Sequence, residues 1–180
     1  MALLGVFLRS VTKALSPLIV EGLYNDFWQF KIAVNSASKQ SVMFKVLEYV
    51  YFRYLENKTC WIGLNSNVRG GGIITPHGLF GIFISDKALI GQNAVIFHHV
   101  TIGSNNLKDS LKRGSPIIGD NVYIGAGAKI IGAVRIGNNV RIGANCIVVK
   151  DVPDNCVVVT KGTCVIKKEI QLDNTYIDNK

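Results

Sequence analysis

Long apolar runs and paired cysteines are both absent from this sequence of 180 residues. A membrane-spanning helix needs about 18 or more largely uncharged apolar residues, whereas the apolar start at Met1 reaches a charge at Arg9. That start also lacks the basic residues and the cleavage site of a secretory leader. None of the four cysteines forms a C-x-x-C pair, so we expect reduced thiols, no metal site and a cytoplasmic protein.

Acidic residues are also scarce, with 12 against 20 basic residues and a formal net charge of +8. Such a surplus suits an anionic ligand, a nucleic acid or an acidic surface, and it could equally serve solubility alone. Because the basic residues are not interleaved with aromatic residues, we expect no nucleic-acid partner. Hydrophobic residues make up 48% of the chain, which excludes a disordered protein by composition and allows a sizeable core.

Residues 1–57 carry aromatic residues and lysines at helical spacing and predict a helical N-terminal cap. The apolar residues that recur at helical steps, as one buried face should, are Val42, Phe44, Leu47, Tyr51 and Leu55. Pro17 is expected to break an earlier helical stretch, which gives two or three short helices. Residues 1–24 could form an amphipathic helix that touches a membrane or a partner, although such segments more often pack on their own domain.

From about residue 62 the sequence repeats every six residues. Aliphatic residues stand six apart at Ile62, Val68 and Ile74, at Ile84, Ile90, Ile96 and Ile102, and at Ile118, Ile124, Ile130, Ile136, Ile142 and Val148. A helix would need a period of 3.6 and a flat strand a period of 2. Six residues supply one short strand and one corner, and three such units close a coil that stacks on the next at about 4.8 Å. The repeat therefore predicts an all-β parallel β-helix over residues 58–168, followed by a polar tail at 169–180.

Two interruptions break the six-residue rhythm. The first is a step of ten residues, in place of six, from Ile74 to Ile84, and it contains His77. The second is the polar and basic segment 103–117, whose turn-forming residues predict a loop outside the coils. Because long loops on rigid scaffolds commonly carry function, we expect the functional residues at these two places.

The segment Ile118–Ala128, which reads IGDNVYIGAGA, resembles the hexapeptide signature of left-handed β-helix acyltransferases. Residues 62–168 are similar to the serine acetyltransferase group and, more narrowly, to short O-acetyltransferases of polysaccharide gene clusters, of the colanic acid type. The stretches that match are Ile74–Gly78, Val100–Gly103 and Val149–Asn155. The resemblance implies a left-handed β-helix, a homotrimer, and acetyl-CoA as the acyl donor without a metal.

The resemblance places His77 at the position of the family's catalytic base. A hydroxyl is a poor nucleophile until a base takes its proton, and imidazole, with a reference pKa of about 6.5, suits that task. His98 aligns with a polar residue of the same cleft and is a second catalytic candidate. His99 is a weaker candidate for contact with the substrate. Either of these two histidines could instead be a hydrogen-bonded corner residue.

Acetyl-CoA needs a narrow apolar cleft for its pantetheine arm and cations for its phosphates. Small residues could let the arm lie against the backbone at Gly103, Gly125, Ala126, Gly127 and Ala144. Lys150 and Lys161 could meet the phosphates as point charges. Glycine and alanine are also what the corners of the coils require, so a purely structural role stays open.

Three departures from the serine-specific members bear on the acceptor. The coil before His77 reads WIGLNSN over residues 61–67 and holds no carboxylate, and Pro76 stands where an aspartate is usual. The loop lacks the family's Arg-His-Pro stretch, and Arg113 lies one place away from it. These departures favour a sugar hydroxyl as acceptor, with Asn65 or a backbone carbonyl orienting the base and Arg113 contacting the substrate.

The sequence thus predicts an O-acetyltransferase that acts on a saccharide, for example in capsule or O-antigen synthesis. Serine O-acetyltransfer is the alternative within the same reaction class. A non-enzymatic β-helix scaffold is the alternative outside it, as is a carbonic-anhydrase-like metal site that would need all three histidines.

Overall fold

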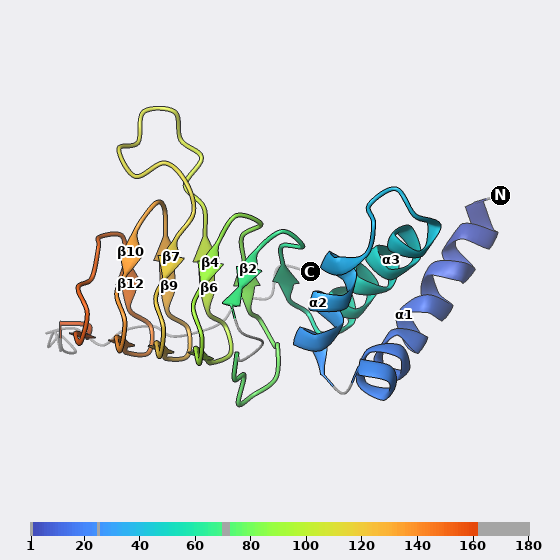
Figure 1. Ribbon diagram of the computed structural model, residues 1–180, viewed down its shortest axis with the longest axis horizontal. Coiled ribbons are helices and arrows are strands. Elements are labelled where there is room, and N and C mark those ends of the chain that lie inside the picture. The colour runs from blue at the N-terminus through green and yellow to red at the C-terminus, as the bar shows by residue number, and fades with distance from the viewer. Residues whose placement is uncertain (1, 25, 70–72, 162–180) are drawn as a thin grey trace, which may run out of the picture.

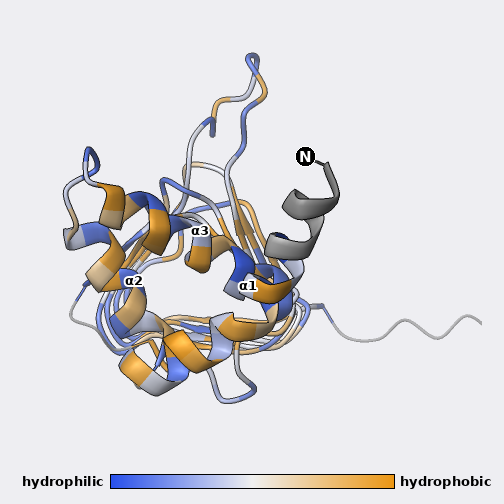
Figure 2. Cartoon of the chain, turned by 90° about the vertical axis from the view of Figure 1, so that its right-hand side faces the viewer, coloured by the Kyte–Doolittle hydropathy of each residue, from blue (hydrophilic) through white to orange (hydrophobic). Residues whose placement is uncertain are grey.

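A computed structural model describes residues 2–24, 26–69 and 73–161, with the side chains of residues 2–8 excepted. Three helices precede a stack of short parallel strands (Figure 1). The helices are α1 (Ala2–Tyr24), α2 (Phe27–Ser36) and α3 (Val42–Asn57). They form a cap at one end of the stack, seen end-on in Figure 2. The predicted tail from residue 169 lies outside the described residues.

Side-chain caps fix where two of the helices begin. The carboxylate of Asp26 accepts a hydrogen bond from the amide of Gln29 at 2.9 Å, at the start of α2. The hydroxyl of Ser41 accepts one from the amide of Phe44 at 3.0 Å, at the start of α3. Each cap satisfies an amide that has no partner within its own helix.

Pro17 does not break α1, contrary to the sequence prediction, and the helix runs from Ala2 to Tyr24. Proline lacks an amide, so the carbonyl of Lys13 loses its helical donor. The hydroxyl of Ser16 donates to that carbonyl instead, at 2.9 Å. The substitute hydrogen bond explains how one long helix tolerates the proline.

The predicted buried face of α3 is correct except at its first residue. Phe44, Tyr51 and Leu55 are buried in the cap core, whereas Val42 is 77% exposed. Val42 is the first helical residue, directly after the capping Ser41, so it lies before the turn that packs.

The strands follow one another around three parallel sheets. They are β1 (Trp61–Ile62), β2 (Asn67–Val68), β3 (Phe83–Ile84), β4 (Leu89–Ile90), β5 (Val95–Ile96), β6 (Thr101–Gly103), β7 (Ile117–Ile118), β8 (Tyr123–Ile124), β9 (Lys129–Ile131), β10 (Arg135–Ile136), β11 (Arg141–Ile142), β12 (Ile147–Val148) and β13 (Val157–Val158). Sheet A has the order β1-β3-β6-β9-β12, sheet B the order β10-β7-β4-β2 and sheet C the order β13-β11-β8-β5. The chain visits A, B and C in turn, which confirms the parallel β-helix that the repeat predicts.

The six-residue positions form the core of the β-helix. From Ile84 to Val148 every aliphatic residue of the repeat is buried, with at most 4% of its surface exposed. Cys146 replaces a small aliphatic residue at one corner and is buried as a free thiol. The repeat is wrong at Ile74, which is 56% exposed, while its neighbour Ile73 is buried. The phase of the repeat therefore shifts by one residue before the first interruption.

Three columns of turns connect the sheets. We call the turns from sheet C to sheet A the histidine corner; they comprise residues 75–82, 97–100, 125–128 and 143–146. We call the turns from sheet A to sheet B the loop corner; they comprise residues 63–66, 85–88, 104–116, 132–134 and 149–151. The third column carries a ladder of asparagines in left-handed conformation, Asn93, Asn121, Asn139 and Asn155, whose side-chain amides bond at 3.1–3.2 Å.

The predicted loop is present between β6 and β7 and projects away from the coils in both views (Figures 1 and 2). A short antiparallel bridge between Asn105 and Gly114 closes its base. Within the described part of the chain, no helix is both long enough and apolar enough to cross a bilayer. Contact of residues 1–24 with a membrane surface stays a prediction.

Candidate active site

His77 and His98 meet at the histidine corner. Their Nδ1 atoms are 2.7 Å apart, and their ring centroids are 4.8 Å apart. The interruption places His77 in a tight turn, where the amide of Gly78 donates to the carbonyl of Thr75 at 2.9 Å. His98 follows β5 in the next coil, and Phe97 beside it packs edge-on against the ring of His77. The structure thus pairs the two catalytic candidates, which are separated by 21 residues in sequence.

The hydrogen bond between the two rings constrains their protons. One Nδ1 must donate and the other must accept, so at least one ring keeps a proton there. If His77 donates from Nδ1, its Nε2 is left without a proton and can act as a base. His98 is then the group that fixes the tautomer of His77.

His99 has a different environment. Its backbone takes the left-handed conformation, with φ of +59°. Its amide donates to the carbonyl of Phe80 at 3.1 Å, and its ring packs edge-on against the ring of Phe80. A side chain on Gly81 would collide with the His99 ring, since an added Cβ would lie 2.5 Å from its Nδ1. These contacts support the corner beside the histidine pair.

A hollow of about 660 Å³ opens beside His77, between the helical cap and the β-helix. We call it the acceptor hollow; its walls include Glu21, Asp26, Phe27, Trp28, Tyr54, His77 and Phe80. Hydrogen bonds from Lys58 and Tyr54 keep the pKa of Glu21 below its ordinary value, so this carboxylate is charged at neutral pH. The sequence analysis missed both carboxylates because they come from the cap, and only its docking on the β-helix brings them to His77.

The residues suggested for the pantetheine arm lie mostly in the histidine corner: Gly125, Ala126, Gly127 and Ala144. Backbone hydrogen bonds stack this corner below the histidines. The amide of Gly127 donates to the carbonyl of His98 at 3.0 Å, and the amide of Asn145 donates to the carbonyl of Ala126 at 2.8 Å. Gly127 has φ of +72°, which by itself explains a glycine at that position. The small residues therefore form a column along the edge that begins at the histidine pair.

Other candidates lie elsewhere in the same chain. Arg113 and Lys150 belong to the loop corner, and Gly103 ends β6 directly before it. Lys161 follows β13 and so continues the histidine corner. Asn65 does not orient His77 within one chain, because it too lies at the loop corner. Its side chain donates to the carboxylate of Asp86 at 2.7 Å.

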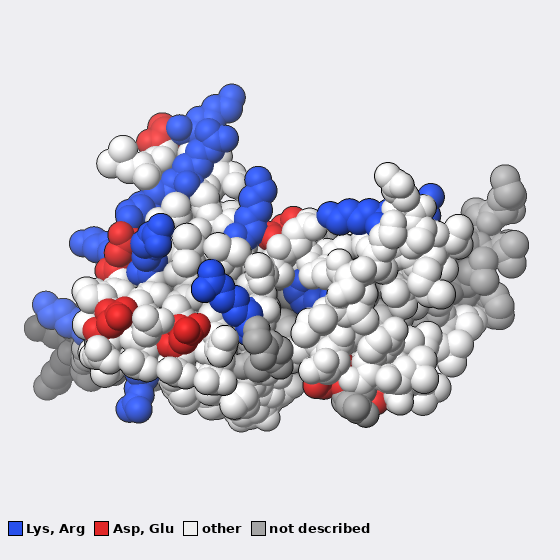
Figure 3. Space-filling view, viewed as in Figure 1, with Lys and Arg blue, Asp and Glu red and all other residues white. Residues whose placement is uncertain are grey.

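The loop corner forms a groove of its own. This loop groove has a volume of about 950 Å³, and its lining includes Trp61, Phe83, Asp86, Gly103, Arg113 and Ser115. Lysines and arginines gather on the face that carries the loop (Figure 3). The two interruptions of the repeat, around His77 and at residues 103–117, therefore lie on two different edges of one β-helix.

Metal ligands do not cluster in the described residues, where no group of three or more histidines, cysteines and acidic residues could hold an ion. His77 and His98 bond to each other, and the ring of His99 lies 5.5 Å from that of His98. Each described cysteine is a free thiol.

Comparisons with known proteins agree with this architecture. The family model described as bacterial transferase hexapeptide (six repeats) matches residues 115–150. The serine acetyltransferase of Synechococcus elongatus is 41% identical over 105 residues, covering 58% of this chain and 42% of that protein. That of Mycobacterium tuberculosis is 41% identical over 92 residues, covering 51% of this chain and 39% of that protein. The match thus spans about two fifths of the length of these relatives.

Solved structures show the same likeness. The soybean serine acetyltransferase apoenzyme has a TM-score of 0.62 and 30% identity, covering 74% of this chain and 53% of that one. The Neisseria gonorrhoeae serine acetyltransferase in complex with serine has a TM-score of 0.57 and 30% identity, covering 74% and 50%. With the hexapeptide repeat, these structures imply a left-handed β-helix and support the hexapeptide-repeat acyltransferase class. They give no support to the narrower resemblance to polysaccharide-cluster enzymes.

Proposed function

We propose that this chain is an acetyl-CoA-dependent O-acetyltransferase whose general base is His77. The observation that carries the proposal is the 2.7 Å contact between His77 and His98 at the edge where the small-residue column begins. The relatives and solved neighbours are serine acetyltransferases, which transfer an acetyl group to a hydroxyl, and this supports the reaction class.

The proposed reaction needs one base and no covalent enzyme intermediate. His98 accepts a hydrogen bond from the Nδ1–H group of His77, which leaves Nε2 of His77 without a proton. This Nε2 atom removes the proton of the acceptor hydroxyl. The oxygen attacks the thioester carbonyl, and a backbone amide of the corner stabilises the oxyanion. The carbon–sulfur bond then breaks, and the thiolate of CoA takes the proton from His77. One ester forms, one thioester is lost and the base is regenerated.

Acetyl-CoA would lie along the histidine corner. The side chain of Ala126 is half-buried and that of Ala144 is exposed, so neither blocks the pantetheine arm from reaching the backbone. Lys161 continues the same edge beyond Ala144 and would meet a phosphate. Gly125 and Gly127 belong to this column. Lys150 lies at the loop corner, so it would contact a CoA phosphate only from a neighbouring chain.

A homotrimer would unite the two functional edges. The histidine pair and the loop open on different edges of one chain, so the loop cannot cover its own chain's histidines. In a ring of three chains related by rotation, the loop corner of one can face the histidine corner of the next. Gly103, Arg113 and Asn65 would then act on the neighbour's site.

Serine is the acceptor that we propose, because the relatives and solved neighbours are serine acetyltransferases. The acceptor hollow beside His77 carries Glu21, which pairs with Lys58 at 2.8 Å, and Asp26, which caps α2. Carboxylate oxygens that these contacts leave available would suit the ammonium group of an amino acid. The absence of a carboxylate in residues 61–67, which pointed to a sugar, is offset by these two residues of the cap. A saccharide stays the second candidate because aromatic walls at Phe27, Trp28 and Phe80 also suit a sugar ring.

The test follows release of the CoA thiol from acetyl-CoA by the full chain, with serine or with a panel of saccharides. A blank without acceptor corrects for the protein's own thiols, since Cys156 is half-buried rather than buried. We expect serine-dependent release. Release with a saccharide and none with serine would assign the second acceptor. No acceptor-dependent release would favour the non-enzymatic scaffold.

A further inference from the structure

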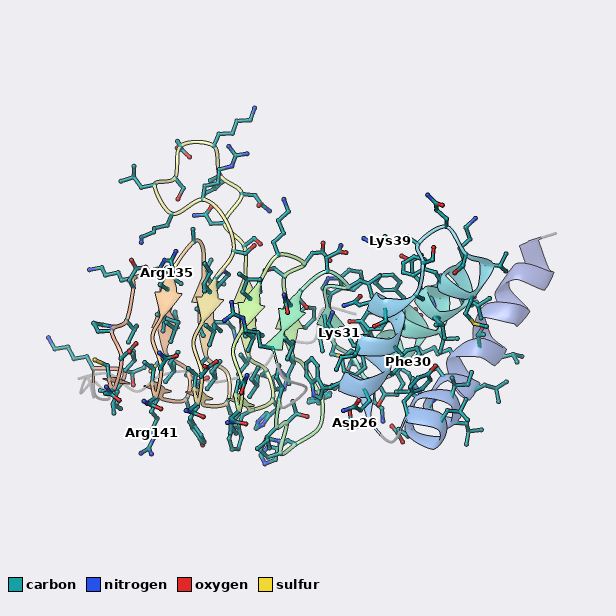
Figure 4. All side chains as sticks on the ribbon, in the orientation of Figure 1. Asp26, Phe30, Lys31, Lys39, Arg135 and Arg141 are labelled. Atoms are coloured by element: carbon teal, nitrogen blue, oxygen red, sulfur yellow. The ribbon has the colours of Figure 1, made fainter. Side chains whose placement is uncertain are left out.

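A pocket of about 430 Å³ separates α2 from the first coil of the β-helix, away from the histidine pair. We call it the lysine pocket; its lining includes Trp28, Lys31, Asn35, Lys39, Asn65 and Asn67. Two cations and three amide side chains line it, and among the described residues no carboxylate does. In Figure 4, Lys31 and Lys39 both lie at the junction of the cap with the coils, whereas Asp26 lies at the lower edge.

Lys31 is an unusual residue for this position. Its surface is only 3% exposed, although lysine is almost never fully buried unless it is paired. Its ammonium donates to the carbonyl of Leu64 at 2.6 Å and lies 6.0 Å from the centre of the Tyr51 ring. Among the described residues, no carboxylate lies within 4.0 Å of it. A neutral carbonyl satisfies one of three N–H groups, and Asp86, which lies beyond ion-pair distance, compensates the buried charge only in part.

We infer that the lysine pocket binds a small oxyanion, a carboxylate or a phosphate carried by a compact molecule. Lys31 and Lys39 would supply the positive charge, and the amides of Asn35, Asn65 and Asn67 would supply hydrogen bonds. Trp28 and Ile32 form the apolar wall against which the rest of the ligand would pack. The volume is that of a small-ligand site.

The charge around Lys31 supports this inference. Burial lowers the pKa of Lys31 to about 8, while Asp86 of the first corner raises it in part. The other groups that face it are the ring of Tyr51 from α3 and the ammonium of Lys39. A bound anion would favour the protonated form. Affinity should therefore fall about tenfold for each pH unit above 8, as Lys31 loses its proton.

The site adjoins the loop groove through one side chain. Asn65 lines the lysine pocket and donates to both carboxylate oxygens of Asp86, through its amide at 2.9 Å and its side chain at 2.7 Å. Asp86 in turn lines the loop groove. A ligand that contacts Asn65 would thus lie one hydrogen bond from that groove.

Calorimetric titration of the full chain tests the inference, with inorganic phosphate and benzoate as the two oxyanion probes. Neutral benzamide serves as the matched probe without charge. We expect saturable binding of one phosphate or benzoate per chain, and none of benzamide. Binding of phosphate alone would identify a phosphate ligand, and binding of benzoate alone a carboxylate ligand. Absence of saturable binding with both oxyanions would overturn the inference.

Variants locate the site. Lys31→Met removes the buried charge and should weaken binding by at least about thirtyfold. Lys39→Met, at an exposed residue, keeps the test valid if the first variant fails to fold, and should also weaken binding. Lys45→Met is the control, because Lys45 is exposed on α3 and does not line the pocket. Equal affinities in all these chains would place the anion elsewhere and overturn the inference.

Discussion

The Nδ1 atom of His77 lies 2.7 Å from the Nδ1 atom of His98, one coil further along the β-helix. This pairing gives the proposed base an orienting partner that is not a carboxylate. An imidazole partner can accept a hydrogen bond from the base without placing the fixed negative charge of a carboxylate beside it. The pair therefore ties the tautomer of His77 to an intact His98.

Replacing His98 tests its orienting role. We expect His98→Ala to lower kcat by about 10- to 100-fold, with the KM for acetyl-CoA little changed, because His77 loses its tautomer partner. His98→Gln should recover part of the rate, since its side-chain carbonyl can accept the Nδ1 proton. Steady-state kinetics of both variants, with Lys45→Ala as a control, measure this. Equal rates for the Ala and Gln variants would argue against a hydrogen-bonded role.

Mixing two inactive variants tests the shared site. His77→Ala removes the base, and Arg113→Ala alters the loop that we place on the neighbouring chain. Random mixed trimers should recover about a quarter of wild-type activity, because a quarter of the interfaces combine an intact histidine with an intact loop. The chains are unfolded together, refolded and assayed. If the mixture stays as inactive as either variant alone, the loop serves its own chain.

The asparagine ladder should contribute to stability. Asn121 has φ of +55° and exchanges side-chain hydrogen bonds with Asn93 and Asn139. We expect Asn121→Ala to lower the free energy of unfolding by about 2 kcal/mol, from lost hydrogen bonds and a side chain in left-handed conformation. Asn121→Gly loses the bonds without the strain and should cost less. Urea unfolding of the three chains checks the order, and a glycine variant less stable than the alanine variant would contradict it.

The burial of Lys31 makes the free energy of unfolding change with pH in the alkaline range. Burial lowers the pKa of Lys31 from 10.5 to about 8. Between these values the unfolded chain keeps the proton that the folded chain has lost, so the free energy of unfolding rises with pH. Relative to Lys31→Met, wild type should gain up to about 3 kcal/mol between pH 8 and 10.5. Urea unfolding at both limits measures it, and a constant difference between the two chains would refute the buried charge.

The six-residue rhythm was sufficient to predict the β-helix, because each aliphatic residue from Ile84 onward has a unique place in a stacked coil. The same rhythm failed at Ile74, where the phase shifts before the interruption. The prediction that Pro17 ends a helix was wrong, because the hydroxyl of Ser16 replaces the hydrogen-bond donor that proline lacks. Local sequence pattern therefore predicts regular strands and helices well. It does not predict exceptions that depend on one particular side chain nearby.

The site was only partly predictable. His77 and His98 could each be named from sequence, but their contact depends on how the irregular segment 75–82 folds between Ile74 and β3. Glu21 and Asp26 lie more than fifty residues before His77, and nothing in the repeat indicates that the cap brings them to it. Tertiary docking, rather than a motif, assembles the acceptor hollow.

The most direct test of the proposed function is acetyl transfer by His77→Ala, measured as serine-dependent thiol release at saturating acetyl-CoA. Circular dichroism and gel filtration should first show that the variant keeps the fold and assembly of wild type. Loss of a general base should lower kcat by about a hundredfold or more. A rate within a few-fold of wild type would contradict the assignment of His77 as the base.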